Sequence, residues 1–185
     1  RDVQAVTAYV MTPPRRKWDA IQQGERMARD ERRRLGLGKT PVPHVADLLD
    51  AQGILVAMEK MPDDVSGLTL VDPEIGILIV VNEDHALARR RFSYAHEYCH
   101  VLADRDRRGI VSRSSERDEL IEVRANAFAA AFLMPDYGMR EFVSSLGKGR
   151  ASRMGTTVFD ESSTVEAHAR STPGSQELQF YDIVQ

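Results

Sequence analysis

The sequence predicts an α+β protein in which a small sheet of about three strands packs on helices. Short apolar, β-branched runs fall within residues 54–81, whereas residues 15–52 and 83–134 carry apolar side chains at helical spacing. Because the strands follow one another and the strongest helices come after them, the order is typical of an α+β chain. With 185 residues, the chain is long enough for one domain with its own core.

Two helices are expected before the strands. Residues 15–35 alternate apolar and charged side chains at helical spacing and are followed by two glycines. Residues 42–52 have prolines near their start and Gly53 after their end, which is typical of a second helix. Upstream, residues 1–14 stop at two prolines and are interpreted as the remnant of a preceding element or as a linker.

Three runs have the composition of strands, at residues 54–56, 65–70 and 75–81. The sequence Asp-Pro-Glu at 72–74 separates the last two runs. Proline presets its own φ angle and aspartate can accept hydrogen bonds from nearby backbone, so a hairpin is expected there.

Two helices should follow the strands, over residues 83–103 and 117–134. Acidic residues at the start of the first helix suit its dipole, and a proline stops the second. The domain is therefore expected to span residues 15–146. From 147 to 185 the composition turns to Gly, Ser, Thr and Arg, which favours a flexible or irregular segment, and an apolar run at 178–184 has the pattern of a further element.

Composition narrows the class of function. A net charge of -3 gives no general attraction to nucleic acid or acidic membranes. No run approaches the roughly 18 apolar residues of a membrane span. The single cysteine, Cys99, permits no internal disulfide, which fits a reducing cytoplasm. We therefore expect a cytoplasmic protein without a direct nucleic-acid or membrane partner, while its oligomeric state stays open.

The run from His96 to His100 matches the pattern H-E-x-x-H. At about 100° per residue, both histidines and Glu97 share one arc of a helix. Two imidazoles can then bind one ion at about 2.1 Å, while Glu97 lies close enough to take a proton from a bound water. The pattern predicts a Zn²⁺ site with Glu97 as catalytic base; Mn²⁺ or Fe²⁺ is an alternative ion. The alternative interpretation is that the two histidines and the glutamate coincide by chance on a solvated helix face.

Glu122, on the helix predicted at 117–134, is the candidate for the third protein ligand that a catalytic zinc needs. The small Ala125 and Ala129 would let this helix approach the first one. Asn126, one turn after Glu122, is expected to bond the outer nitrogen of a ligand histidine and fix its tautomer. From the residues alone, Glu122 can equally be a surface acid on an alanine-rich packing helix.

Both motifs together resemble the ImmA/IrrE family of metallopeptidases. The resemblance covers roughly residues 42–140 and is carried by the run from Arg91 to His100, the run from Glu122 to Pro135, and Asn82 at a strand end. It implies a zincin-like fold with a gluzincin-like third ligand. In that family, the residues matching His96, His100 and Glu122 bind zinc, and the one matching Glu97 is catalytic.

The resemblance also implies a function. Typical members cleave a helix-turn-helix (XRE-type) repressor and so release genes of a mobile element or a stress response, which implies a bacterial or phage-encoded protein. The expected activity is therefore zinc-dependent endopeptidase action on a repressor. The competing function is a non-catalytic metal-binding module that binds or senses a regulatory protein. Glu97 favours the enzyme, since a purely structural site has no need of a carboxylate beside an open position.

Overall fold

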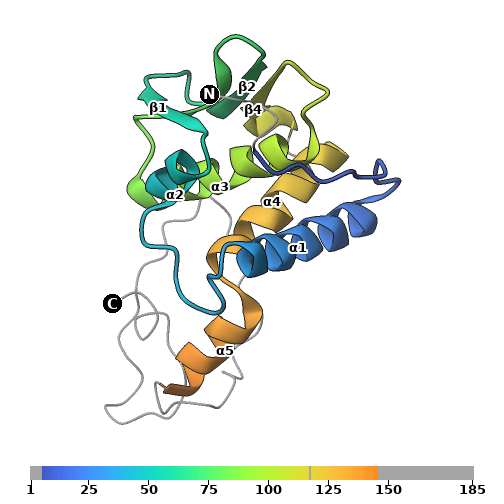
Figure 1. Ribbon diagram of the computed structural model, residues 1–185, viewed down its shortest axis with the longest axis vertical. Coiled ribbons are helices and arrows are strands. Elements are labelled where there is room, and N and C mark those ends of the chain that lie inside the picture. Colours follow the sequence, from blue (N-terminus) through green and yellow to red (C-terminus); the bar gives the residue numbers. More distant parts are fainter. Residues whose placement is uncertain (1–5, 117, 146–185) are drawn as a thin grey trace. The chain divides into compact units, whose positions relative to one another are not determined.

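The computed structural model describes residues 6–116 and 118–145 (Figure 1). Contacts divide the chain into two units, one ending at Pro135 and the other beginning at Asp136. None of the helices in the described part is both long and apolar enough to cross a bilayer. The elements, in chain order, are α1 (Lys17–Arg34), α2 (Val45–Ala51), β1 (Leu55–Glu59), β2 (Val65–Asp72), β3 (Gly76–Asn82), α3 (Leu87–Ala103), β4 (Gly109–Arg113), the 3-10 turn η2 (Ser114–Glu116), α4 (Leu120–Leu133) and α5 (Asp136–Ser145).

The strands form one sheet in the order β1-β3-β2-β4. β1 pairs in parallel with β3, and β2 pairs antiparallel with both β3 and β4. The predicted hairpin at 72–74 is present: the Asp72 carboxylate accepts hydrogen bonds from the N–H groups of Glu74 and Ile75 at 2.8 and 3.0 Å. β3 lies in the middle of the sheet and is buried along most of its length, which explains its continuous apolar sequence.

The α+β class is confirmed, but the described residues form four strands where the sequence predicted three. The missed strand, β4, has only two adjacent apolar residues, and its exposed and buried side chains alternate. Its pairing with β2 places Ile110 opposite Thr69 and Ser112 opposite Gly67. Pairing between distant segments, rather than local composition, therefore defines this strand.

The four predicted helices each begin two to four residues later than expected. The helix predicted from residue 83 begins at Leu87, because the Asn82 side-chain oxygen accepts the Asp84 N–H at 3.1 Å and holds the intervening residues in a turn. The helix predicted at 117–134 spans Leu120–Leu133, and a 3-10 turn at residues 114–116 precedes the predicted range. Residue 117 lies outside the described residues.

α3 is the central helix of the first unit, because it contacts β2 and β3 as well as α4 (Figure 1). Tyr98 of α3 packs edge-on against Phe128 and Phe132 of α4. α1 packs on α4 in turn. A Cβ added at Gly24 would collide with the Arg124 carbonyl oxygen and lie 2.8 Å from the Phe128 nitrogen. Glycine at this position therefore allows α1 to approach the backbone of α4, the helix that carries Glu122.

The segment before α1 contributes to the core. Val6 is buried among the apolar side chains of the first unit. The backbone N–H of Tyr9 donates to the Leu102 carbonyl at 2.7 Å, and its hydroxyl donates to the buried Glu31 at 3.0 Å. Residues 6–14, predicted as a remnant or linker, thus pack on α1 and α3. The segment predicted at 147–185, with its apolar run at 178–184, lies outside the described residues.

Candidate metal centre

Side chains from α3 and α4 converge at one buried point. His96 and His100, one turn apart on α3, meet Glu122 from the first turn of α4. Their relative exposures are 5%, 1% and 4%. The possible ligand atoms of these three residues all lie within 4.8 Å of one another. The structure therefore brings together the three residues that the sequence predicted as a ligand set.

The spacing of these atoms fits a tetrahedral zinc. The Nε2 atoms of His96 and His100 lie 3.2 Å apart, and each lies close to a Glu122 oxygen, at 3.0 and 3.3 Å. Two atoms bound to one zinc at about 2.0–2.1 Å in a tetrahedron are themselves about 3.3 Å apart. Two imidazole nitrogens and a carboxylate are also the donor types that zinc takes in catalytic sites.

The outer nitrogens of both histidines have oxygen partners. His96 Nδ1 lies 2.9 Å from Asn126 Oδ1, which is the contact that the sequence predicted for Asn126. His100 Nδ1 lies 2.9 Å from Asp104 Oδ2. A proton on each Nδ1 donates to these oxygens and leaves the Nε2 lone pairs directed into the cluster, as a metal ion requires.

Glu97 is fully buried against the sheet. The Thr69 hydroxyl of β2 donates to Glu97 Oε2 at 2.8 Å, which fixes one carboxylate oxygen. The other oxygen, Oε1, has no hydrogen-bond partner within the described part of the chain. A Cβ added at Gly67 would lie 2.9 Å from this Oε1, so glycine in β2 leaves the space that the carboxylate occupies. A buried carboxylate with one free oxygen is placed to accept a proton from a small molecule.

Comparison with protein families gives a match to the Peptidase_M78 model, described as the IrrE N-terminal-like domain, over residues 49–164. The match covers more than half of the chain. The chain belongs to this family. The resemblance to ImmA/IrrE proteins is thereby confirmed, and with it a zincin-like fold of metallopeptidase type. No curated protein matches the sequence.

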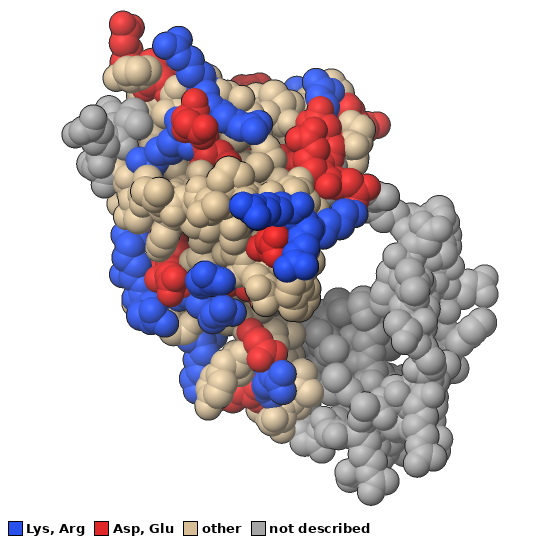
Figure 2. Space-filling view, turned by 90° about the vertical axis from the view of Figure 1, so that its right-hand side faces the viewer, with Lys and Arg blue, Asp and Glu red and all other residues tan. Residues whose placement is uncertain are grey.

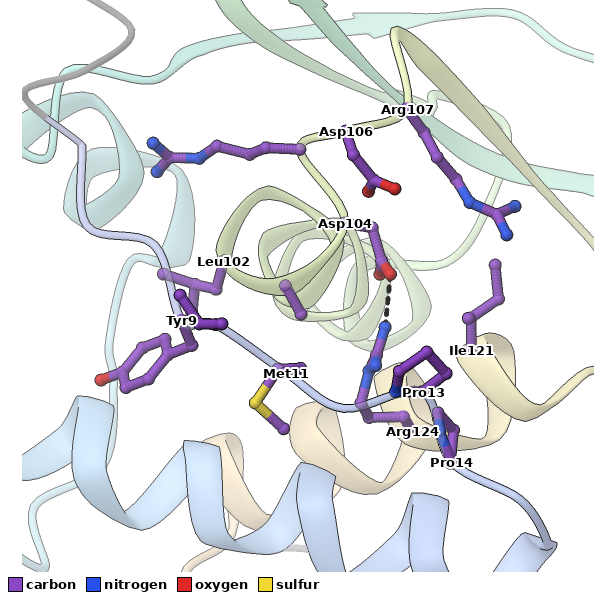
Figure 3. Close-up of a pocket in the computed structure, with 13 residues that line it drawn as sticks. Tyr9, Met11, Pro13, Pro14, Leu102, Asp104, Asp106, Arg107, Ile121 and Arg124 are labelled. Carbon is purple, nitrogen blue, oxygen red and sulfur yellow. Dashed lines mark hydrogen bonds and ion pairs between the residues drawn. The ribbon is translucent and has the colours of Figure 1, made fainter.

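In this Peptidase_M78 domain, the His100 side chain depends on two residues that the sequence analysis missed. Asp104, which accepts from His100, is itself paired with Arg124 of α4 at 2.5 Å (Figure 3). Asp104 and Arg124 are 7% and 2% exposed. Asp104 was detectable, because it follows His100 by four residues and so lies on the same helix face. Arg124 became recognisable only once α3 and α4 were seen to pack together.

The Asp104–Arg124 pair also forms part of a cavity of about 380 Å³. Tyr9, Met11 and Pro13 from the segment before α1 also line the cavity, and Figure 3 shows Pro13 next to Arg124. Among the described residues that line the cavity there is none of the three cluster residues. The lining of the cavity therefore includes Asp104, the partner of His100, but none of the three cluster residues.

Burial and hydrogen bonding shift the pKa values of Glu122 and His100 in opposite directions. Burial alone would raise the pKa of Glu122, but its hydrogen bonds with His100 and His96 outweigh this effect and lower the pKa to about 2. Burial would likewise lower the pKa of His100, but Asp104 and Glu122 outweigh it and raise the pKa to about 9. Glu122 is thus a carboxylate at neutral pH, and without a metal ion His100 carries the compensating charge.

Cys99, inside the H-E-x-x-H run, does not belong to the cluster. Its side chain is fully buried in the core. Burial raises the pKa of its thiol to about 12. Its Sγ atom is not in the group of possible ligand atoms that His96, His100 and Glu122 form among the described residues.

Proposed function

We propose that this chain is a zinc-dependent endopeptidase that hydrolyses a peptide bond in a protein partner. One observation carries the proposal: the buried cluster of His96, His100 and Glu122 is accompanied by a carboxylate, Glu97, whose charge acts on His100 and whose Oε1 is unpartnered within the described residues. A structural zinc site is closed by four protein ligands. Here three ligands converge, and the free carboxylate beside them suits a position left for water and substrate.

His96, His100 and Glu122 would hold the metal. When bound, zinc lowers the pKa of water toward about 7 and polarises a carbonyl group. Glu97 Oε1 accepts the proton of the attacking water, and the same carboxyl later donates it to the leaving amine. The Thr69 hydroxyl keeps Oε2 engaged, so that proton transfer takes place at Oε1.

The partner that we propose is a helix-turn-helix repressor, whose cleavage derepresses stress or mobile-element genes in a bacterial or phage setting. The family resemblance supports this substrate class. Figure 2 shows basic and acidic side chains interspersed over the face that it presents, so this face does not favour a nucleic-acid partner. A mixed surface of this kind exerts no strong pull on a polyphosphate. A cytoplasmic location is part of the same proposal.

The test compares the zinc-loaded wild type with Glu97→Gln and with a matched control, Glu119→Gln, on a repressor encoded beside this protein. Glu119 is the exposed residue before α4 and is not one of the three cluster residues, so its amide variant makes the same chemical change outside the cluster. Mass spectrometry of the repressor reports cleavage, and metal analysis reports zinc content.

We expect one zinc per chain in all three proteins and cleavage by the wild type and Glu119→Gln only. Cleavage by Glu97→Gln at the wild-type rate would show that another group is the base. Zinc binding without any cleavage product in the wild type would favour the non-catalytic module instead. Reloading the protein with Mn²⁺ or Fe²⁺ in the same assay identifies the ion that supports the highest rate.

A further inference from the structure

Ser112 of β4 carries a buried hydroxyl that the proposed mechanism does not use. The residue is 2% exposed, and its Oγ has no hydrogen-bond partner among the described residues. A buried hydroxyl without a partner costs about 1–3 kcal/mol in proteins. Buried polar atoms that look unpaired are therefore commonly paired with a bound water or ligand.

The pairing of β4 with β2 places Ser112 on the face of the sheet that meets Glu97. Ser112 lies opposite Gly67, and Ile110 lies opposite Thr69. Paired residues in an antiparallel ladder direct their side chains to the same face, with Cβ atoms about 4.5–5.5 Å apart. On this face, Thr69 bonds Glu97, and a Cβ added at Gly67 would lie 2.9 Å from Glu97 Oε1.

Two unpartnered polar atoms thus belong to one small region of the described structure, Ser112 Oγ on the sheet and Glu97 Oε1 on α3. Gly67, which pairs with Ser112 and leaves room for the Glu97 carboxylate, contributes no side chain. Both residues are almost fully buried, so their common partner must be small. Water fits, because a buried water needs between about two and four polar partners.

We propose that Ser112 is a positioning residue that holds the water deprotonated by Glu97. The water donates one proton to Glu97 Oε1, and its oxygen accepts a hydrogen bond from the Ser112 hydroxyl. The hydrogen bond from Ser112 orients the water molecule. It sets the direction in which the proton leaves and the side of the oxygen that attacks. The inference rests on the proposed function, since it gives the water of that reaction its second protein partner.

The kinetic test compares Ser112→Ala with Ser114→Ala, which removes the same hydroxyl from an exposed residue just after β4. We expect Ser112→Ala to keep its zinc content, Tm and KM and to lose about tenfold in kcat, equivalent to about 1.4 kcal/mol. Ser114→Ala should match the wild type. An unchanged kcat in Ser112→Ala, or a loss confined to KM, would overturn the proposal.

A crystal structure of the zinc-loaded wild type gives a second test that needs no substrate. We expect a solvent molecule within hydrogen-bond distance of both Ser112 Oγ and Glu97 Oε1. Absence of such a molecule, or a protein partner on Ser112 Oγ, would overturn the proposal even if the protein is an active peptidase. Conversely, a protein that cleaves nothing but holds a water between Ser112 Oγ and Glu97 Oε1 would support the positioning role of Ser112. The proposed peptidase function would then have failed separately.

Discussion

Replacing Gly67 by alanine should disturb the centre without touching a ligand. The added Cβ would lie 2.9 Å from both Glu97 Oε1 and the Val80 carbonyl oxygen, about half an ångström short of ordinary contact at 3.4 Å. The Val80 oxygen belongs to the backbone of β3 and cannot rotate away. Glu97 and β2 must therefore both move by a few tenths of an ångström.

The size of the effect follows from this displacement. Overpacking of a buried site costs about 1–3 kcal/mol, which lowers the Tm of a domain of this size by about 3–10 °C. Misplacement of a catalytic group by about 1 Å costs about 100-fold in rate, so a shift of half that size in Glu97 should cost about tenfold in kcat. Zinc content should stay at the wild-type level, because the three ligands are not the atoms that the new methyl group meets.

Gly109→Ala is the matched control for Gly67→Ala. Gly109 begins the neighbouring strand β4, and the nearest atoms to an added Cβ, in Leu70 and Thr69, lie 4.0 Å away. Both variants are assayed by thermal unfolding, metal analysis and repressor cleavage. If Gly67→Ala had the Tm and cleavage rate of the wild type, the close approach of Glu97 to β2 would be refuted. If both variants lost Tm and cleavage rate equally, the losses would come from the different strand propensities of glycine and alanine.

Two further predictions concern the surroundings of the cluster. Asp104→Asn should weaken zinc binding by about 10–100-fold in a competitive chelator titration, because it removes the charged partner of His100 Nδ1, whereas Asp106→Asn, an exposed change, should have no effect. In the metal-free protein, Glu122, lowered from 4.5 to about 2, stabilises the fold above pH 4.5 and loses this contribution as the pH falls through 2. His100, raised from 6.5 to about 9, stabilises it below pH 6.5 and loses this contribution as the pH rises through 9. The Tm of the metal-free protein should therefore be highest between about pH 4.5 and 6.5, and a Tm that rises from pH 6.5 to 9 would contradict the His100 interaction.

The parts of the centre that lie on one helix were predictable from the sequence. His96, Glu97 and His100 share an arc of α3 because of their spacing alone. Glu122 and Asn126 are one turn apart on α4, so both face His96 once the two helices pack. Their convergence needed the family resemblance, because nothing in the local sequence states which helices touch.

The parts that depend on strand pairing were not predictable. Thr69 and Gly67 of β2 contact or make room for Glu97, and Ser112 of β4 pairs with Gly67. The place of Ser112 follows from the pairing of a strand whose composition gives little sign of it. The beginning of α3 was misplaced for a related reason. Asn82 holds the turn before that helix through side-chain hydrogen bonds, which a pattern of acidic residues does not reveal.

X-ray absorption spectroscopy of the zinc-loaded protein reports the atoms bound to the ion and so tests whether His96, His100 and Glu122 hold it. We expect one zinc per chain with nitrogen and oxygen neighbours at about 2.0–2.1 Å and the multiple-scattering signal of two imidazoles. A sulfur neighbour at about 2.3 Å, which could come only from Cys99 or a methionine, or a signal of fewer than two imidazoles, would contradict the assignment of His96, His100 and Glu122 as the metal ligands.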